Sequence, residues 1–336
     1  MTGVSVIIPT YNRAGLVNQT VQNVLSQSLP PSEVIVVDDG STDNTVDSLN
    51  SEFGTQIHVV QQQNQGPGAA RNAGLRLATG DFIWLMDSDD LASLNQLETQ
   101  VDSLKRHSAD VVYSPWARVW FKGNRLELDG PVLQQRAIPD DRDCLEWFST
   151  GWSLVFQHCL FRKSLIDRVG FYRTDLWTCD DSEYFWRVLY ESPKIIFDDR
   201  SIMLYRLDDY GKVTASGFGA KRRIIDWAQC LISVHSILAE RRPDITREPD
   251  YIFRLYSALR SLCQFCPEET QLISQLRTLI EPRFFLLSKL DAGYRRMSNG
   301  IRRRIVGHSW SRAYQAEAVT PAQEVLIRQM GFHLEP

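Results

Sequence analysis

The first 114 residues alternate between short apolar runs and segments of helical periodicity, and this order constrains the fold more than any other feature of the chain. Apolar runs such as Val-Ile-Val-Val at 34–37 are continuous, which fits strands of a sheet that helices cover on both faces. The alternation predicts βαβ units and therefore an α/β fold with a doubly wound, mostly parallel sheet. We expect strands at 4–8, 33–37, 57–60, 82–86 and 110–114, and helices at 15–27, 44–53, 68–78 and 91–107.

The pattern changes twice further along the chain. Between 116 and 206 it loosens into short strands and turns, with a helix expected near 181–191 and a strand at 202–206. Long helical periodicities follow after about residue 217, separated by Arg-Pro-Asp and Cys-Pro-Glu turns. We therefore expect a first domain at 1–216 and an all-helical extension at 217–336, with helices at 220–240, 251–266 and 268–290.

Charge and composition exclude several classes of function. The 37 Lys and Arg residues against 41 Asp and Glu give a net charge of −4, which gives no reason to expect a nucleic-acid binder. No secretion signal opens the sequence, and no run of 18 apolar residues predicts a membrane-spanning helix. The six scattered cysteines do not form the dense framework of a small secreted domain. We therefore expect a cytoplasmic protein with reduced thiols.

Acidic side chains follow the predicted strands, at the edge of the sheet where ligands bind in such folds. Asp38 and Asp39 come directly after the second strand, and Asp87 and Asp89 follow the strand at 82–86. If the chain keeps its strand direction, positions i and i+2 point the same way, so Asp87 and Asp89 converge on one cation. Mg²⁺ or Mn²⁺ suits such carboxylates together with substrate phosphates. The alternative is that these aspartates only close turns and cap helices.

Four motifs in a fixed order resemble those of a known family. They are Val-Ile-Ile-Pro-Thr-Tyr-Asn at 6–12, Val-Val-Asp-Asp-Gly-Ser-Thr-Asp at 36–43, Gly-Pro-Gly-Ala-Ala-Arg-Asn-Ala-Gly at 66–74 and Leu-Met-Asp-Ser-Asp-Asp at 85–90. In order and spacing the chain resembles family 2 of the inverting glycosyltransferases, which have the GT-A fold. The resemblance is strong over 1–110 and continues more weakly to about 216. It implies a nucleotide-binding half at 1–110 and an acceptor half at 111–216.

The resemblance implies a pocket for a nucleotide sugar. Asp39 would accept a hydrogen bond from the base, and Arg71 would reach the base or the phosphates. The turn before Gly68 would let backbone approach the ligand ahead of a helix amino terminus. In the alternative, Asp38 and Asp39 belong to a turn and Arg71 lies on a solvated helix face. The nucleotide-binding residues implied are Pro9, Thr10, Tyr11, Asn12, Asp38, Asp39, Gly68, Arg71, Asp87 and Ser88.

The reacting groups are also implied by the resemblance. Asp89, with help from Asp87, would hold Mn²⁺ or Mg²⁺, which would neutralise the charge that grows on the leaving diphosphate. Asp181 would be the base that takes the proton of the acceptor hydroxyl. Asp180 stands beside it where the family usually has Glu. The alternative is that Asp180 or Asp181 only caps the helix that begins there.

Residues around this acidic pair have simpler expected roles. Glu183 and Arg187 are spaced as an i, i+4 ion pair, and we favour that role for them. Trp177 and Trp186 flank the acids, and large aromatic side chains at such positions are more often core than a platform for a sugar ring.

Two basic segments follow. Arg206 or Lys212 would supply positive charge to the donor phosphates from a segment where Asp208 and Asp209 stand in place of the family's histidine. A basic cluster in the tail is interleaved with apolar residues and predicts either peripheral contact with anionic lipid on the inner membrane face or a solvated helix. The cluster consists of Arg295, Arg296, Arg302, Arg303 and Arg304.

Together these features predict an inverting transfer of a sugar from a nucleotide-diphosphate donor, UDP first and dTDP second, to a hydroxyl acceptor. The family often builds bacterial surface polysaccharides, so the expected acceptor is a glycan or glycolipid. A sugar nucleotidyltransferase is a weaker alternative, because it should carry a Gly-rich basic loop where this chain has Pro-Thr-Tyr-Asn-Arg at 9–13. A catalytically silent sugar-nucleotide sensor or scaffold is the alternative outside the enzymes.

Overall fold

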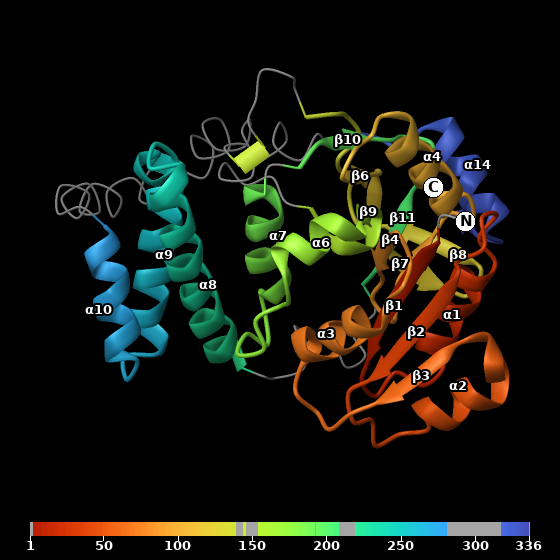
Figure 1. The fold of residues 1–336 in the computed structure, drawn as a ribbon, viewed down its shortest axis with the longest axis horizontal. Helices are drawn as coiled ribbons and strands as arrows, with labels where there is room; N and C mark the ends of the chain where they lie inside the picture. Colours follow the sequence, from red (N-terminus) through yellow and green to blue (C-terminus); the bar gives the residue numbers. More distant parts are fainter. Residues whose placement is uncertain are drawn as a thin grey trace.

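A computed structural model describes residues 3–138, 144–145, 154–191, 193–207, 219–280 and 317–335, and Figure 1 shows its ribbon. Seven strands form the larger sheet, in the order β10-β6-β9-β4-β1-β2-β3. Neighbouring strands are parallel except that β9 runs antiparallel to both β4 and β6, which confirms a mostly parallel sheet. In sheet order the bounds are Ile195–Phe197, Val111–Tyr113, Cys159–Arg162, Phe82–Leu85, Val4–Thr10, Glu33–Asp38 and His58–Gln61.

Successive side chains of the central strands enter two different hydrophobic clusters, because side chains alternate between the faces of a strand. Val6 and Ile8 of β1 belong to one cluster and Ile7 to the other, and all three are fully buried. Burial of each such side chain stabilises the fold by about 1.5–3 kcal/mol, so a one-residue slip in register is strongly disfavoured. Helices α1 (Leu16–Leu25), α2 (Thr45–Phe53) and α4 (Gln96–Arg106) cover one face, and α3 (Pro67–Leu77), α6 (Lys163–Val169) and α7 (Asp180–Tyr190) cover the other.

A second sheet of five strands has the order β12-β8-β7-β11-β5. Its strands in that order are His333–Leu334, Arg125–Leu128, Trp116–Lys122, Met203–Arg206 and Leu91–Ala92. The prediction of a helix over 91–107 is wrong at its start, because Leu91 and Ala92 pair with β11 and the helix begins only at Gln96. The backbone N–H of Ser93 also donates to Ile202 O at 2.9 Å, which extends the pairing.

The helical extension packs against α7 (Figure 1). It comprises α8 (Gly219–Arg241), α9 (Pro249–Phe265) and α10 (Thr270–Leu279), and short 3-10 turns occur at Gly54–Gln56, Phe156–His158 and Ile245–Arg247. One hydrophobic cluster runs from Ile7 in the sheet to Leu276 in α10, so the extension shares the core of the first domain. The boundary at 216 and 217 stays a prediction.

The end of the chain departs from the expected all-helical pattern. Helix α14 (Pro321–Gln329) is followed by strand β12, which pairs with β8 and so returns to the second sheet. Thr320 caps α14 by accepting from the backbone N–H of Gln323 at 3.3 Å. The last residues are therefore held by the sheet as well as by their own helix, a tertiary pairing that helical periodicity does not reveal.

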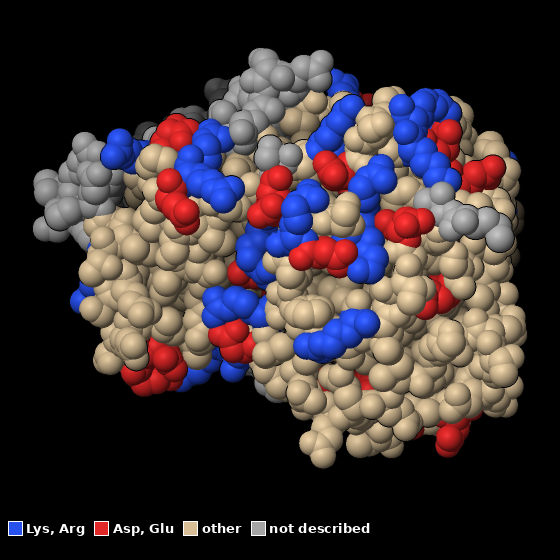
Figure 2. Space-filling view, in the orientation of Figure 1, with Lys and Arg blue, Asp and Glu red and all other residues tan. Residues whose placement is uncertain are grey.

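Several expectations concern parts of the chain outside the described residues. These are the roles of Asp208, Asp209 and Lys212 and the lipid contact of the basic cluster at 295–304. Within the described ranges, none of the helices combines the length and the apolar composition needed to span a membrane. Figure 2 shows Lys and Arg interspersed with Asp and Glu over the face it draws, with mostly uncharged residues at the lower right.

Candidate active site

The predicted acids lie where β2 and β4 end and where α7 begins. Asp38 is the last residue of β2, and Asp180 is the first residue of α7. The expectation that Asp87 and Asp89 continue a strand is wrong, because β4 ends at Leu85 and a turn follows in which Asp90 N–H donates to Asp87 O at 3.4 Å. This turn, which also holds the buried Ser88, carries the chain from the larger sheet into β5 of the second sheet.

Arg71 of α3 joins two of these acidic segments. Its Nη1 donates to Asp180 Oδ2 at 2.6 Å and its Nη2 donates to Asp87 Oδ1 at 2.9 Å. The guanidinium also lies over the rings of Phe156 and Tyr172, 5.8 and 5.5 Å from their centres. With only 7% of its surface exposed, Arg71 is not on a solvated helix face, so that alternative is excluded.

Burial shapes the proton affinity of the acidic pair that begins α7. The pKa of Asp180 is raised to about 7, mainly by burial and also by the charges of Asp181 and Asp87, while Arg71 opposes the shift. The pKa of Asp181 is also raised, mainly by burial, again against the effect of Arg71. A carboxyl group whose pKa approaches neutrality accepts a proton more readily than an ordinary aspartate, as a general base requires.

The start of α7 has an uncommon backbone conformation. Cys179 at the N-cap has φ of 61°, in the left-handed region that residues with side chains rarely adopt, and its side chain makes no capping bond. Asp181 Oδ1 accepts from Ser182 N–H at 2.7 Å within the first turn of α7, whereas the N-cap position itself belongs to Cys179. Such strain is often found at functional sites.

The i, i+4 pair expected further along this helix is confirmed. Arg187 Nη2 lies 2.9 Å from Glu183 Oε2, and Glu183 is almost fully buried. The same carboxylate accepts from Ser233 of α8 at 3.2 Å, which ties α7 to the extension. These residues therefore stabilise the scaffold behind the acids.

Asp39 organises the loop that leads into α3. It accepts from the backbone N–H groups of Gln65 at 3.0 Å and Gly66 at 2.8 Å, and from the side chain of Gln62 at 2.7 Å. Burial raises the pKa of this carboxyl, and the three hydrogen bonds act in the opposite direction. Asp38 accepts from the backbone N–H of Ser41 at 3.1 Å and so stabilises the turn after β2, and its nucleotide contact stays a prediction.

The end of β1 lies beside this loop. Asp39 N–H donates to Thr10 O at 2.9 Å, and the buried hydroxyl of Thr10 has no hydrogen-bond partner among the described residues. Tyr11, two residues after Pro9, keeps 42% of its surface exposed. Asn12 has φ of 51°, and its Oδ1 accepts from Thr42 N–H at 2.8 Å. A buried hydroxyl and an exposed ring next to Asp39 suit a planar ligand with polar edges.

The turn before α3 brings two distant segments into contact. A side chain at Gly68 would place its Cβ 2.8 Å from the carbonyl oxygen of Arg173 and 3.4 Å from Tyr172 Cβ. A Cβ at Gly66 would lie 3.4 Å from the ring of Trp177. Trp177 therefore packs beside this turn, which supports the packing role over a sugar platform. Both glycines allow a close approach between the loop and the segment that leads to α7.

The carboxylates expected to bind a cation have different surroundings. Asp87 accepts from Arg71 and from Gln157 Nε2 through its two oxygens, whereas the nearest Arg13 nitrogen is 3.9 Å from Asp89 Oδ2. The described residues contain no group of three or more metal-binding side chains. A cation bound here would need substrate phosphates to complete its coordination beside one or two carboxylates, as is common for Mg²⁺.

Three site residues escaped the sequence analysis or had another expected role. Gln157, in a 3-10 turn 70 residues from Asp87, holds that carboxylate, and no local pattern indicates the contact. Arg13 directly follows a recognised motif and reaches Asp89. The Arg206 guanidinium, expected near phosphates, donates to Asp89 O at 2.7 Å and stacks 3.7 Å from the ring centre of Phe121. Arg206 thus supports the acidic turn.

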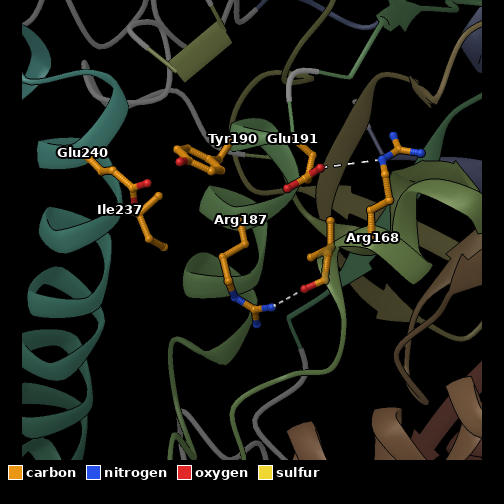
Figure 3. Close-up of a pocket in the computed structure, with 7 residues that line it drawn as sticks. Arg168, Arg187, Tyr190, Glu191, Ile237 and Glu240 are labelled. Atoms are coloured by element: carbon orange, nitrogen blue, oxygen red, sulfur yellow. Dashed lines mark hydrogen bonds and ion pairs between the residues drawn. The ribbon is translucent and has the colours of Figure 1, made fainter.

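A separate cavity of about 200 Å³ lies near the far end of α7, roughly 15 Å along the helix from Asp180 (Figure 3). Its arginines already have partners, because Arg168 lies 3.6 Å from Glu191 and Arg187 donates to Val169 O at 2.9 Å. It offers no group comparable with the buried acids of α7, so we do not regard it as the reaction site.

The sequence matches a known family over its first half. The model of glycosyl transferase family 2 matches residues 5–170. The glycosyltransferase GlyG of Streptococcus pneumoniae serotype 4 is 28% identical over 249 residues, which are 69% of this chain and 78% of GlyG. Several other relatives match over only 125 to 141 residues, and this chain then spans about half of their length or less.

The fold is similar to that of two solved structures. S. aureus TarS 1–349 in complex with UDP-GlcNAc has a TM-score of 0.55 and 19% identity, with coverage of 82% of this chain and 90% of TarS 1–349. The mannosyltransferase PcManGT from Pyrobaculum calidifontis, in complex with GDP-Man and Mn²⁺, has a TM-score of 0.50 and 20% identity, covering 93% and 85%. At this identity the likeness concerns the fold, and it confirms the GT-A architecture predicted from the sequence.

Proposed function

Because this chain belongs to glycosyl transferase family 2, we propose that it is a metal-dependent inverting glycosyltransferase, with a nucleotide-diphosphate sugar as donor and a hydroxyl group as acceptor. The observation that carries the proposal is the double contact of Arg71, whose two Nη atoms donate to Asp180 and to Asp87. Acids from the turn after β4 and from the start of α7 thereby lie around a single region beside the turn that Asp39 organises.

Asp181 is the proposed base. Its carboxylate takes the proton of the acceptor hydroxyl while that oxygen forms a bond to the anomeric carbon of the donor. The bond between this carbon and the diphosphate oxygen breaks with its electron pair, and a single displacement of this kind inverts the configuration. Asp180 keeps Arg71 beside the reaction, and the raised pKa of both acids suits proton transfer near neutral pH.

The donor half of the proposal rests on the segments around Asp39. Pro9, Thr10 and Tyr11 line the base, Asp39 orients it, and the backbone ahead of Gly68 lies near the phosphates. Asn12, Asp38 and Ser88 shape the surrounding turns. Asp89, with Asp87, would hold Mn²⁺ or Mg²⁺, and the bound cation would offset the charge of the leaving diphosphate.

UDP is the proposed nucleotide and dTDP the second choice. TarS was solved with UDP-GlcNAc and PcManGT with GDP-Man and Mn²⁺, so structures of this fold bind different nucleotides. The proposed acceptor is a hydroxyl group of a glycan or glycolipid in bacterial surface polysaccharide synthesis, as the family resemblance implies. The identity of the donor therefore needs a direct screen.

The test is turnover of a panel of nucleotide sugars with Mn²⁺ or Mg²⁺, measured as released nucleoside diphosphate and as the configuration of the product. We expect release only with a cation and a product of inverted configuration. Asp181→Asn should reduce kcat by on the order of 10²–10⁴-fold, because it removes the general base. Asp47→Asn, at an exposed position of α2, is the matched control and should leave turnover unchanged.

Two outcomes contradict the proposal. If turnover survives in Asp181→Asn, Asp181 is not the catalytic base. Calorimetric binding of a nucleotide sugar without any turnover would instead favour the sensor or scaffold.

A further inference from the structure

Asp226 of α8 anchors the segment that leads into the acidic pair of α7. Its Oδ2 accepts from the backbone N–H of Trp177 at 3.0 Å and from the backbone N–H of Thr178 at 2.8 Å. The hydroxyl of Thr178 donates to the same oxygen at 3.0 Å. Asp226 is fully buried, so its carboxylate interacts with other protein groups and not with solvent.

Trp177 and Thr178, which Asp226 anchors, lie directly before the strained residue Cys179. Thr178 precedes Cys179, whose φ of 61° turns the chain so that α7 begins at Asp180. A residue with a side chain adopts this conformation only when the surroundings hold it, and the cost is about 1–3 kcal/mol. The hydrogen bonds of Asp226 act on the two residues immediately before that turn. They therefore determine the direction in which Asp180 and Asp181 enter the site.

The anchor has its own charge partner. Arg222, one turn earlier in α8, lies 2.8 Å from Asp226 Oδ1, and its Nη2 donates to the carbonyl oxygen of Asp175. A buried carboxylate is costly unless it is paired and hydrogen-bonded, and Asp226 meets both conditions. Arg222 and Asp226 together hold the segment from Asp175 to Thr178 against α8.

We propose that Asp226 is a positioning residue for the transfer reaction, through which the helical extension sets the placement of the proposed base Asp181. This inference rests on the proposed function. It assigns a role to α8, which lies beyond the residues that the family model matches. Asp226 acts through the backbone of the preceding segment and does not itself contact the reacting atoms.

The decisive variant is Asp226→Ala, with kcat and the dissociation constant of UDP in the presence of Mn²⁺ measured on the full chain. We expect kcat to fall on the order of 100-fold, because small misplacements of a reacting group have effects of this size. UDP affinity should be retained, because the residues proposed to bind the base lie at and just beyond the ends of β1 and β2. Thr178→Val removes only the hydroxyl contact and should give a smaller loss of kcat.

A second variant tests whether the loss of kcat in Asp226→Ala comes from misplacement of the segment before α7 or from a general loss of stability. Asp226→Asn can still accept from the two backbone N–H groups through its amide oxygen, but its amide nitrogen would then face Arg222. Adding Arg222→Met removes that cation together with its contact to Asp175 O, so the double variant should recover part of the lost kcat. Glu268→Gln breaks an exposed ion pair between Glu268 and Lys221 of α8 and should leave kcat unchanged.

The inference is overturned if Asp226→Ala turns over like the parent, or if UDP affinity falls by the same factor as kcat/KM. It is also overturned if the double variant is no better than Asp226→Ala. If the parent protein releases no nucleoside diphosphate from any donor, the proposed function itself is contradicted.

Discussion

Arg71 on α3 and Asp180 on α7 form a buried ion pair at 2.6 Å between residues 109 positions apart in the sequence. The same guanidinium reaches Asp87 at 2.9 Å, so it connects α3 with the turn after β4. Because the charge of Arg71 lowers the pKa of both Asp180 and Asp181, the proton affinity of these acids depends on its position.

Replacing Arg71 by Met should move the acid side of the pH–activity profile to higher pH. Arg71 opposes protonation of Asp180 and Asp181, so its loss raises their pKa and leaves the proposed base protonated over a wider pH range. The measurement is kcat against pH for parent and variant. Arg76→Met is the control, because Arg76 on the same helix stacks 4.6 Å from the ring centre of the exposed Phe171. A profile that stays in place or moves to lower pH would contradict this prediction.

The pH dependence of stability should differ between the parent protein and Asp180→Asn. The pKa of Asp180 rises from 3.8 to about 7 on folding, so between these values the folded protein holds a proton that the unfolded chain has released. The contribution of Asp180 to the free energy of unfolding therefore falls as the pH rises through this window. Asp180→Asn lacks this titration, so its stability relative to the parent should improve with rising pH.

Urea unfolding at several pH values tests this difference. Asp47→Asn, at an exposed position, should show a constant difference from the parent across the same range. A constant difference for Asp180→Asn as well would mean that its pKa is not raised on folding.

Arg206→Met should weaken activation by Mn²⁺. Arg206 donates to Asp89 O at 2.7 Å, and its own backbone N–H donates to Asp90 Oδ1 at 2.8 Å, so it holds the turn that carries the proposed cation ligand. Loss of such a supporting contact typically lowers metal affinity by about 10- to 100-fold. Turnover titrated with Mn²⁺ should show a half-saturating concentration raised by that factor. Arg118→Met, which breaks an exposed ion pair with Asp129, should not change it.

Gly68→Ala should destabilise the protein by about 1–3 kcal/mol, as is typical when an extra methyl group is forced into a filled space. The new Cβ would lie 2.8 Å from the carbonyl oxygen of Arg173, a backbone atom that cannot move aside easily. Thermal or urea unfolding gives the free energy of unfolding. Leu77→Ala, at an exposed position of the same helix, should change it by no more than about 0.5 kcal/mol. Equal stability of both variants would show that the segment at 172–173 can shift.

Much of the fold could be predicted because local pattern and tertiary environment agree in the first half of the chain. Continuous apolar runs indicated strands that are buried on both faces, and β1, β2 and β4 have that environment. The prediction failed at Leu91 and Ala92, since these two apolar residues satisfy a helical pattern equally well. Their pairing with Met203 and Leu204 depends on a strand more than 100 residues away. The strand direction assigned to Asp87 and Asp89 failed because turn-forming residues ended β4 early.

By itself, the sequence determined the order of strands and helices, the two-sided burial of the sheet and the placement of acids after its strands, because periodicity and turn-forming residues act over a few neighbouring positions. Tertiary structure alone decided that Arg71 is buried between Asp87 and Asp180, that Gln157 holds Asp87, and that Asp226 anchors the approach to α7. Each of these contacts joins residues between 16 and 109 positions apart. Such contacts depend on how whole helices and strands pack against one another, and a local sequence pattern does not predict that packing.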